Sequence, residues 1–103
     1  MLESTKSCRI IIDDVGGFDF IEEKGWFAGA AIETDIRRYD FVFYDLDRLK
    51  QEVDGQLQSA SFYFEANLLI VKAVRKEVIV RSLNELVVSG DFAKFISTPI
   101  ESS

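Results

Sequence analysis

The sequence predicts an α+β domain, in which an antiparallel sheet of about five to seven strands carries one main amphipathic helix on one face and a short C-terminal helix. Several short β-branched or aromatic runs end at turn residues, which is typical of antiparallel strands. The stretch 46–57 instead has apolar residues at helical spacing. At 103 residues, with no internal repeat or linker, the chain is expected to form a single domain over 1–103, with a polar lead-in at 1–7 and a loose tail at 97–103.

Three runs near the N-terminus are predicted to form an antiparallel meander. They cover 8–13, 18–22 and 26–34, and glycine-containing turns separate them. Small residues follow one another in the third run. We therefore expect either the close approach of another element or a β-bulge at Gly29.

The next prediction is a strand at 39–44 followed by a helix at 46–57. The strand would place Phe41 and Phe43 on one face. Asp45 is a suitable N-cap for the helix, and oppositely charged residues recur at i,i+4 spacing on its polar side. The apolar stripe of this helix comprises Leu46, Leu49, Val53 and Leu57.

The region after this helix is predicted to form a β-hairpin. Its strands would be 59–65 and 68–74, joined at Asn67, because asparagine tolerates the left-handed conformation of a tight turn. Phe62 and Phe64 share a face of the first strand. We expect both to pack in the core, like the phenylalanines of the preceding strand.

The C-terminal part is predicted to contain a further strand at 78–81 and then a short helix. Ser82 and Glu85 have the spacing of a capping box, in which each side chain bonds to the backbone of the other residue. Gly90 stands where a C-cap glycine belongs. These signals place the start of the helix at Ser82.

The chain contains no histidine and a single cysteine, Cys8. This composition excludes Ser-His-Asp and Cys-His nucleophilic catalysis and most zinc and copper sites. No glycine-rich phosphate-binding motif is present either. Because Cys8 cannot form an internal disulfide, we interpret it as a small apolar strand residue in a reducing, cytoplasmic compartment. We expect no cofactor and no enzymatic activity.

Acidic residues are concentrated in the N-terminal third. The net charge is −6, and residues 1–35 hold eight Asp or Glu against three Lys or Arg, whereas the remainder holds ten against nine. Nucleic-acid binding normally requires a basic surface, so we expect no nucleic-acid partner. No apolar run is long enough to span a membrane, and we expect no membrane association. The sign of the charge suits a basic protein partner.

The densest acidic segment, 13–23, supplies the candidate partner-binding residues. A metal site is an alternative, but adjacent Asp13 and Asp14 would point to opposite faces of a strand, and the spacing does not match an EF-hand loop. The only tryptophan follows shortly; it is a natural interface anchor where it lies on the open face of the sheet, and a core position is the alternative. The candidate residues are Asp13, Asp14, Asp19, Glu22, Glu23 and Trp26.

These observations favour a non-catalytic protein-interaction module, such as an inhibitor-like, immunity-like or regulatory subunit, that binds a basic partner through its acidic N-terminal third. Two alternatives stay open. The high aromatic content and the apolar runs at 68–74 and 78–80 suit a self-associating protein, a homodimer formed through a sheet face or edge. A small-ligand or divalent-metal binder would instead use carboxylates in a pocket between helix and sheet.

Overall fold

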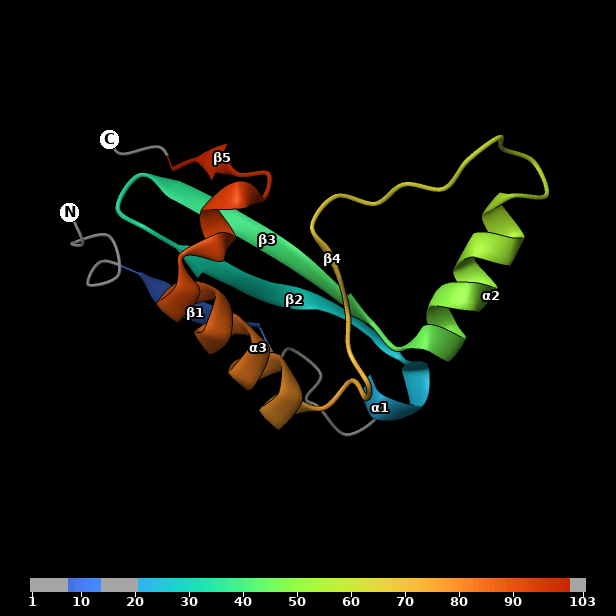
Figure 1. Cartoon of the computed structure of the whole chain (residues 1–103), viewed down its shortest axis with the longest axis horizontal. Coiled ribbons are helices and arrows are strands. Elements are labelled where there is room, and N and C mark those ends of the chain that lie inside the picture. Colours follow the sequence, from blue (N-terminus) through green and yellow to red (C-terminus); the bar gives the residue numbers. More distant parts are fainter. Residues whose placement is uncertain (1–7, 14–20, 101–103) are drawn as a thin grey trace.

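The computed structural model describes residues 8–13 and 21–100, and its fold class is α+β, as predicted (Figure 1). The described residues form five strands, three α-helices and one short 3₁₀ helix. Their bounds are β1 Arg9–Ile12, α1 Ile21–Lys24, β2 Trp26–Glu33, β3 Arg37–Tyr44, α2 Leu46–Gln56, β4 Leu68–Ile70, α3 Lys76–Ser89, the 3₁₀ helix η2 Asp91–Lys94 and β5 Thr98–Pro99.

The strands form one sheet in the order β1-β2-β3-β4, and β5 also pairs with β3. β1 with β2, β2 with β3, and β5 with β3 are antiparallel, as the sequence predicts. β4 is parallel to β3. A parallel neighbour requires a crossover connection, and α2 with the segment 57–67 provides it.

The predicted bulge at Gly29 is present. The register between β2 and β3 shifts between Phe27 and Ala30. The backbone N–H of Asp13 donates to the carbonyl of Gly29 at 2.6 Å. A Cβ atom on Gly29 would lie 2.6 Å from the carbonyl oxygen of Asp13, so glycine is required for this close approach.

The core lies between α3, η2 and one face of the sheet. Edge-to-face ring contacts join the sheet to the C-terminal residues, with centroids 5.2 Å apart for Tyr39 and Phe92 and 5.1 Å apart for Phe41 and Phe95. The largest fully buried side chains are those of Phe41, Phe43, Ile32, Ile79, Leu83 and Val74.

The predicted strand at 78–81 and the predicted helix start at Ser82 are both wrong. A single helix, α3, covers both the predicted strand at 78–81 and the predicted capping box. Ser82 lies in the helix interior, where its hydroxyl donates to the carbonyl of Val78 at 2.8 Å. The helix buries Ile79 and Leu83, which are four residues apart and therefore share one helical face. Gly90 has φ 80° and ends the helix in the left-handed conformation, as predicted.

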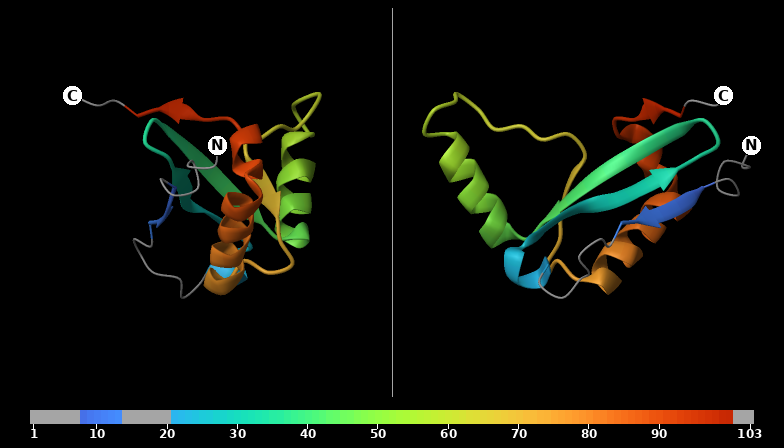
Figure 2. Two further views of the ribbon diagram at one scale, coloured as in Figure 1. Left: turned by 60° about the vertical axis from the view of Figure 1, so that its left-hand side comes forward. Right: turned by 180° about the vertical axis from the view of Figure 1, so that it is seen from behind.

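The predicted helix at 46–57 is confirmed as α2, but another helix covers the core face of the sheet. Asp45 caps α2 by accepting a hydrogen bond from the N–H of Arg48 at 2.8 Å. No residue of α2 is buried. Figure 1, and the same arrangement seen from behind in Figure 2, right, show α2 apart from α3, beyond the end of the sheet where β3 finishes. The apolar face that covers the sheet belongs to α3.

Two predicted strands are also corrected. Residues 18–20 of the run 18–22 lie outside the described residues, and Ile21–Lys24 is the helical turn α1 instead of a strand. The segment 59–65 has no partner strand among residues 8–13 and 21–100, so the predicted hairpin with 68–74 is not formed, and β4 comprises three residues. Phe62 and Phe64 are consequently 72% and 70% exposed, against the expectation that they pack in the core.

Asn67 adopts the predicted left-handed conformation, with φ 57°, but its role differs from that of a hairpin turn. Its side-chain amide donates to the carbonyls of Asp40 at 2.8 Å and Ile96 at 2.7 Å, and its side-chain oxygen accepts from the N–H of Ile96 at 2.9 Å. Asn67 therefore joins the start of β4 to β3 and to the C-terminal segment.

Candidate functional site

The structure describes four of the six residues that the sequence nominates for partner binding. Asp14 and Asp19 lie outside the described residues. Asp13 is exposed at the end of β1, and Glu22 and Glu23 are exposed on α1. Glu22 is already engaged, because its carboxylate accepts a hydrogen bond from Arg75 Nε at 2.8 Å. Within 8–13 and 21–100, no group of three Asp, Glu or Cys side chains is arranged to hold a metal ion.

A different set of residues forms a hollow beside α2. We call α2 together with the segment 57–67 the arm, and this hollow the arm cleft. Its volume is about 570 Å³, which is in the range of small-molecule and side-chain binding sites. The described residues that line it are Tyr44 at the end of β3, Glu52 and Gln56 of α2, and Phe62, Tyr63, Phe64 and Glu65.

Local backbone structure explains why these residues meet. Tyr44 follows Phe43 in a strand, so its side chain points to the sheet face opposite the α3 core. Asp45 then caps α2, and Glu52 and Gln56, at i,i+4 spacing, lie on one side of that helix. The segment that follows α2 returns toward β4 and passes the hydroxyl of Tyr44.

Two tyrosine hydroxyls converge on one carboxylate oxygen in the arm cleft. The hydroxyl of Tyr44 donates to Glu65 Oε1 at 3.0 Å, and that of Tyr63 donates to the same atom at 2.7 Å. Burial, together with the adjacent Glu65, raises the pKa of Tyr63 well above its usual range. Burial also raises the pKa of Tyr44. Both hydroxyls therefore stay protonated at neutral pH and hold Glu65 in place as hydrogen-bond donors.

The lining of the arm cleft is acidic. Glu52 and Glu65 contribute carboxylates, and none of the described lining residues is a lysine or arginine. Arg48 lies one turn away on α2 and forms an ion pair with Glu52, with Nη2 2.9 Å from Oε2. Because Arg48 offsets the charge of Glu52, Glu65 is the residue that leaves the lining negative, and this charge favours a positively charged group over an anion.

Exposed apolar side chains border this acidic hollow. Phe62 and Phe64 alternate with Tyr63 and Glu65, so the two phenylalanines extend from one side of the segment while the other two residues are half-buried. The arm cleft therefore has two neighbouring exposed phenylalanines beside its carboxylates.

Trp26 lies next to the arm cleft. It pairs across the sheet with Tyr44, and Tyr44 pairs in turn with Ile70 of β4. Cross-strand partners share a face of the sheet. Trp26, the one candidate residue predicted as an anchor, is 36% exposed and extends the apolar surface around the cleft.

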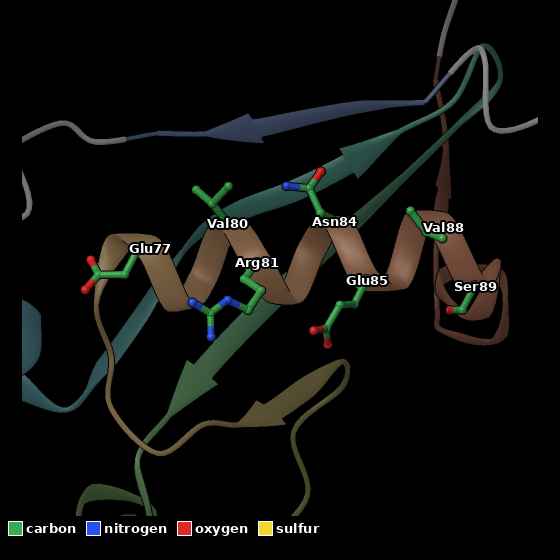
Figure 3. A pocket seen from close by; sticks show the side chains of 7 residues that line it. All are labelled: Glu77, Val80, Arg81, Asn84, Glu85, Val88 and Ser89. Atoms are coloured by element: carbon green, nitrogen blue, oxygen red, sulfur yellow. The ribbon is translucent and has the colours of Figure 1, made fainter.

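A second hollow runs along α3, and Figure 3 shows that its side chains all come from this one helix. It includes Val80 and Val88 together with Arg81 and Glu85, and its volume is about 530 Å³. Among the described residues no other element contributes a wall, and Val88 is 82% exposed. A single helix side without converging polar groups does not define a binding site as closely as the arm cleft does.

Comparison with known proteins gives no family whose model matches the chain, and no curated protein or solved structure that is significantly similar to it. In the part of the chain that the structure describes, no helix has the length and apolar character that crossing a membrane requires.

Proposed function

We propose that the protein is a non-catalytic interaction module and that its arm cleft binds a basic segment of a protein partner. One observation carries this proposal: the cleft combines two carboxylates with two exposed phenylalanines, and no basic residue is found among its described lining. The overall net charge of −6 also favours a basic partner.

Basic and apolar side chains together match both parts of this surface. An ammonium or guanidinium group forms charge-assisted hydrogen bonds with Glu65 and with Oε1 of Glu52, the oxygen that lies outside the ion pair with Arg48. Apolar side chains that alternate with the basic ones pack against the rings of Phe62 and Phe64. A phosphate or carboxylate ligand would instead meet the negative charge of Glu65.

The tyrosines support a binding role over an acid–base role. General acid–base catalysis at neutral pH is most efficient with a group whose pKa lies near 7. The pKa values of Tyr44 and Tyr63 are raised above those of ordinary tyrosines, which are already well above neutral. Their hydroxyls fix the position of Glu65 and leave its second oxygen to accept a partner's hydrogen bond.

The proposal moves the binding surface from the N-terminal acidic segment to the arm. Ion pairing does not separate the two surfaces, because Glu22 is paired with Arg75 and Glu52 is paired with Arg48. The arm differs in that its carboxylates lie beside two exposed phenylalanines. Trp26 retains its proposed role, because it borders the arm cleft through Tyr44. Asp14 and Asp19 stay predictions from the sequence.

A peptide-binding experiment tests the proposal. Fluorescence anisotropy would compare a labelled peptide of alternating lysine and valine with the same peptide in which uncharged norleucine replaces lysine. We expect the lysine peptide to bind at least about tenfold more tightly, a difference of roughly 1.4 kcal/mol, and added salt to reduce that difference. Equal binding of the two peptides would contradict the proposal.

Matched variants locate the binding. Glu65→Gln removes the charge while its amide oxygen still accepts from the tyrosines, and the double variant Phe62→Ala with Phe64→Ala removes the apolar part. Both should weaken binding of the lysine peptide. The controls Glu85→Gln and Val88→Ala change an exposed acid and an exposed apolar residue on α3 and should leave it unchanged.

A further inference from the structure

The backbone of residues 61–65 has unused hydrogen-bonding capacity. No N–H or C=O group of these five residues takes part in any hydrogen bond of the described chain. Only side chains of this segment form hydrogen bonds, through Tyr63 and Glu65. An exposed backbone edge of this kind is a template on which another strand can pair.

This segment already resembles a strand. Aromatic residues at three successive positions, 62 to 64, have high β-propensity. Exposure alternates with the period of two that a strand produces: Phe62 and Phe64 are exposed, whereas Tyr63 and Glu65 are half-buried. Figure 1 shows the chain between α2 and β4 as a long trace with no strand beside it over these residues.

We infer that the basic partner segment binds as an added β-strand along residues 61–65. The inference rests on the function proposed above and specifies the form of its ligand. Backbone hydrogen bonds to the unpaired groups would supply affinity, and side chains at alternate positions would supply specificity. The occupant is an extended segment of another protein, in which basic residues alternate with apolar ones.

The two faces of the segment dictate that alternation. Residues of an added strand that lie on the same face as Tyr63 and Glu65 meet the carboxylate and the hydroxyls, so basic side chains belong there. Residues on the other face meet Phe62 and Phe64, so apolar side chains belong there.

Charge favours a different protein over a second copy of this chain. The segment 61–65 contains one glutamate and no basic residue. Parallel pairing with its own copy would bring two carboxylates together, and antiparallel pairing would place no opposite charge near either of them, whereas a lysine-containing strand supplies the opposite sign.

Backbone methylation of the peptide tests the inference. In a strand that pairs along one edge, only every second N–H group points at its partner. We would prepare two peptides of alternating lysine and valine that carry N-methyl groups on every second residue, in the two possible phases. Their charge and composition are identical, and only the edge that is blocked differs.

The two methylated peptides are expected to differ in affinity. One methylated peptide should bind at least about tenfold more weakly than the parent, and the other should retain binding to within about threefold. Equal affinities for the two methylated peptides, whether both are retained or both are lost, would overturn strand addition. The proposed function would survive that result as long as the parent peptide still binds more tightly than its norleucine counterpart.

Sedimentation equilibrium provides the second measurement. The protein alone should be monomeric, and the variant with both Phe62→Ala and Phe64→Ala should behave identically. A dimer of the unmodified protein that this double variant abolishes would identify a second copy as the occupant and would overturn the inference.

Discussion

Glu33 lies at the centre of a row of charged side chains that crosses three strands. Its carboxylate oxygens are 2.7 Å from Arg9 Nη2 and 2.9 Å from Arg38 Nη1, and Arg38 Nε is 2.9 Å from Asp40. Arg9 and Arg38 are the cross-strand partners of Glu33 on β1 and β3. The hydrogen bonds from these two arginines lower the pKa of Glu33 below its usual value.

This lowered pKa predicts a pH dependence of stability. A carboxyl group whose pKa is lower in the folded state stabilises that state when it is ionised, and the contribution is lost as the pH falls from the unfolded pKa through the folded one. Urea unfolding of the unmodified protein and of Glu33→Gln, measured from about pH 7 to about pH 3, should give a stability difference that is largest at neutral pH and shrinks in the acidic range. A difference that does not change with pH would contradict this assignment of the ion pairs.

Single residues were predictable from the sequence where their role is set by local backbone geometry. The cap at Asp45, the left-handed turn at Asn67 and the C-cap at Gly90 are all present. Burial of Phe62 and Phe64 was not predictable in this way. Alternation shows that two side chains share a face, but only the tertiary structure determines whether anything covers that face.

Among the elements, α3 contains one sequence pattern that favours a strand and another that favours a helix. Val78, Ile79 and Val80 form a β-branched run that favours a strand. The spacing of Ile79 and Leu83 is equally consistent with a helix, and packing of these two residues against the sheet decides between the alternatives. The spacing of Ser82 and Glu85 matches a capping box only by coincidence.

Replacement of Ser82 distinguishes the two interpretations. In the structure its hydroxyl bonds to the carbonyl one turn back, an interaction that contributes little to helix stability, so Ser82→Ala should change the free energy of unfolding by less than about 0.5 kcal/mol. Loss of a true N-cap costs about 1 kcal/mol. Asp45→Ala removes the cap of α2 and should show that loss in the same urea titration. A loss at Ser82 as large as that at Asp45 would contradict the observed start of α3.

At the scale of the whole molecule, the chain divides into a packed part and the arm. The sheet, α3 and η2 enclose the core, and nearly every fully buried side chain belongs to them. The arm contains no buried residue of α2 and leaves two phenylalanines exposed. The predicted class, α+β, follows from strand and helix patterns along the chain. The position of the arm does not, because the apolar stripe of α2 resembles that of a helix that covers a sheet.

The position of the arm, which the sequence does not reveal, explains why the sequence places the candidate site in the N-terminal acidic segment. A run of acids at 13–23 is conspicuous, whereas the residues of the arm cleft come from three separated parts of the chain. The only local signal for the cleft is the alternation of phenylalanine with tyrosine and glutamate in 62–65. That alternation predicts a strand, and the missing partner strand is visible only in the fold.

The central claim is that a basic partner binds to the arm, and mapping by NMR tests it most directly. Titration of the ¹⁵N-labelled protein with the alternating lysine–valine peptide should shift the backbone amides of 61–65, together with those of Tyr44 and Glu52. Asp13, Glu22 and Glu23 should be unaffected. Shifts confined to those three acids, with the amides of 61–65 unchanged, would contradict the account and return the binding surface to the N-terminal acidic segment.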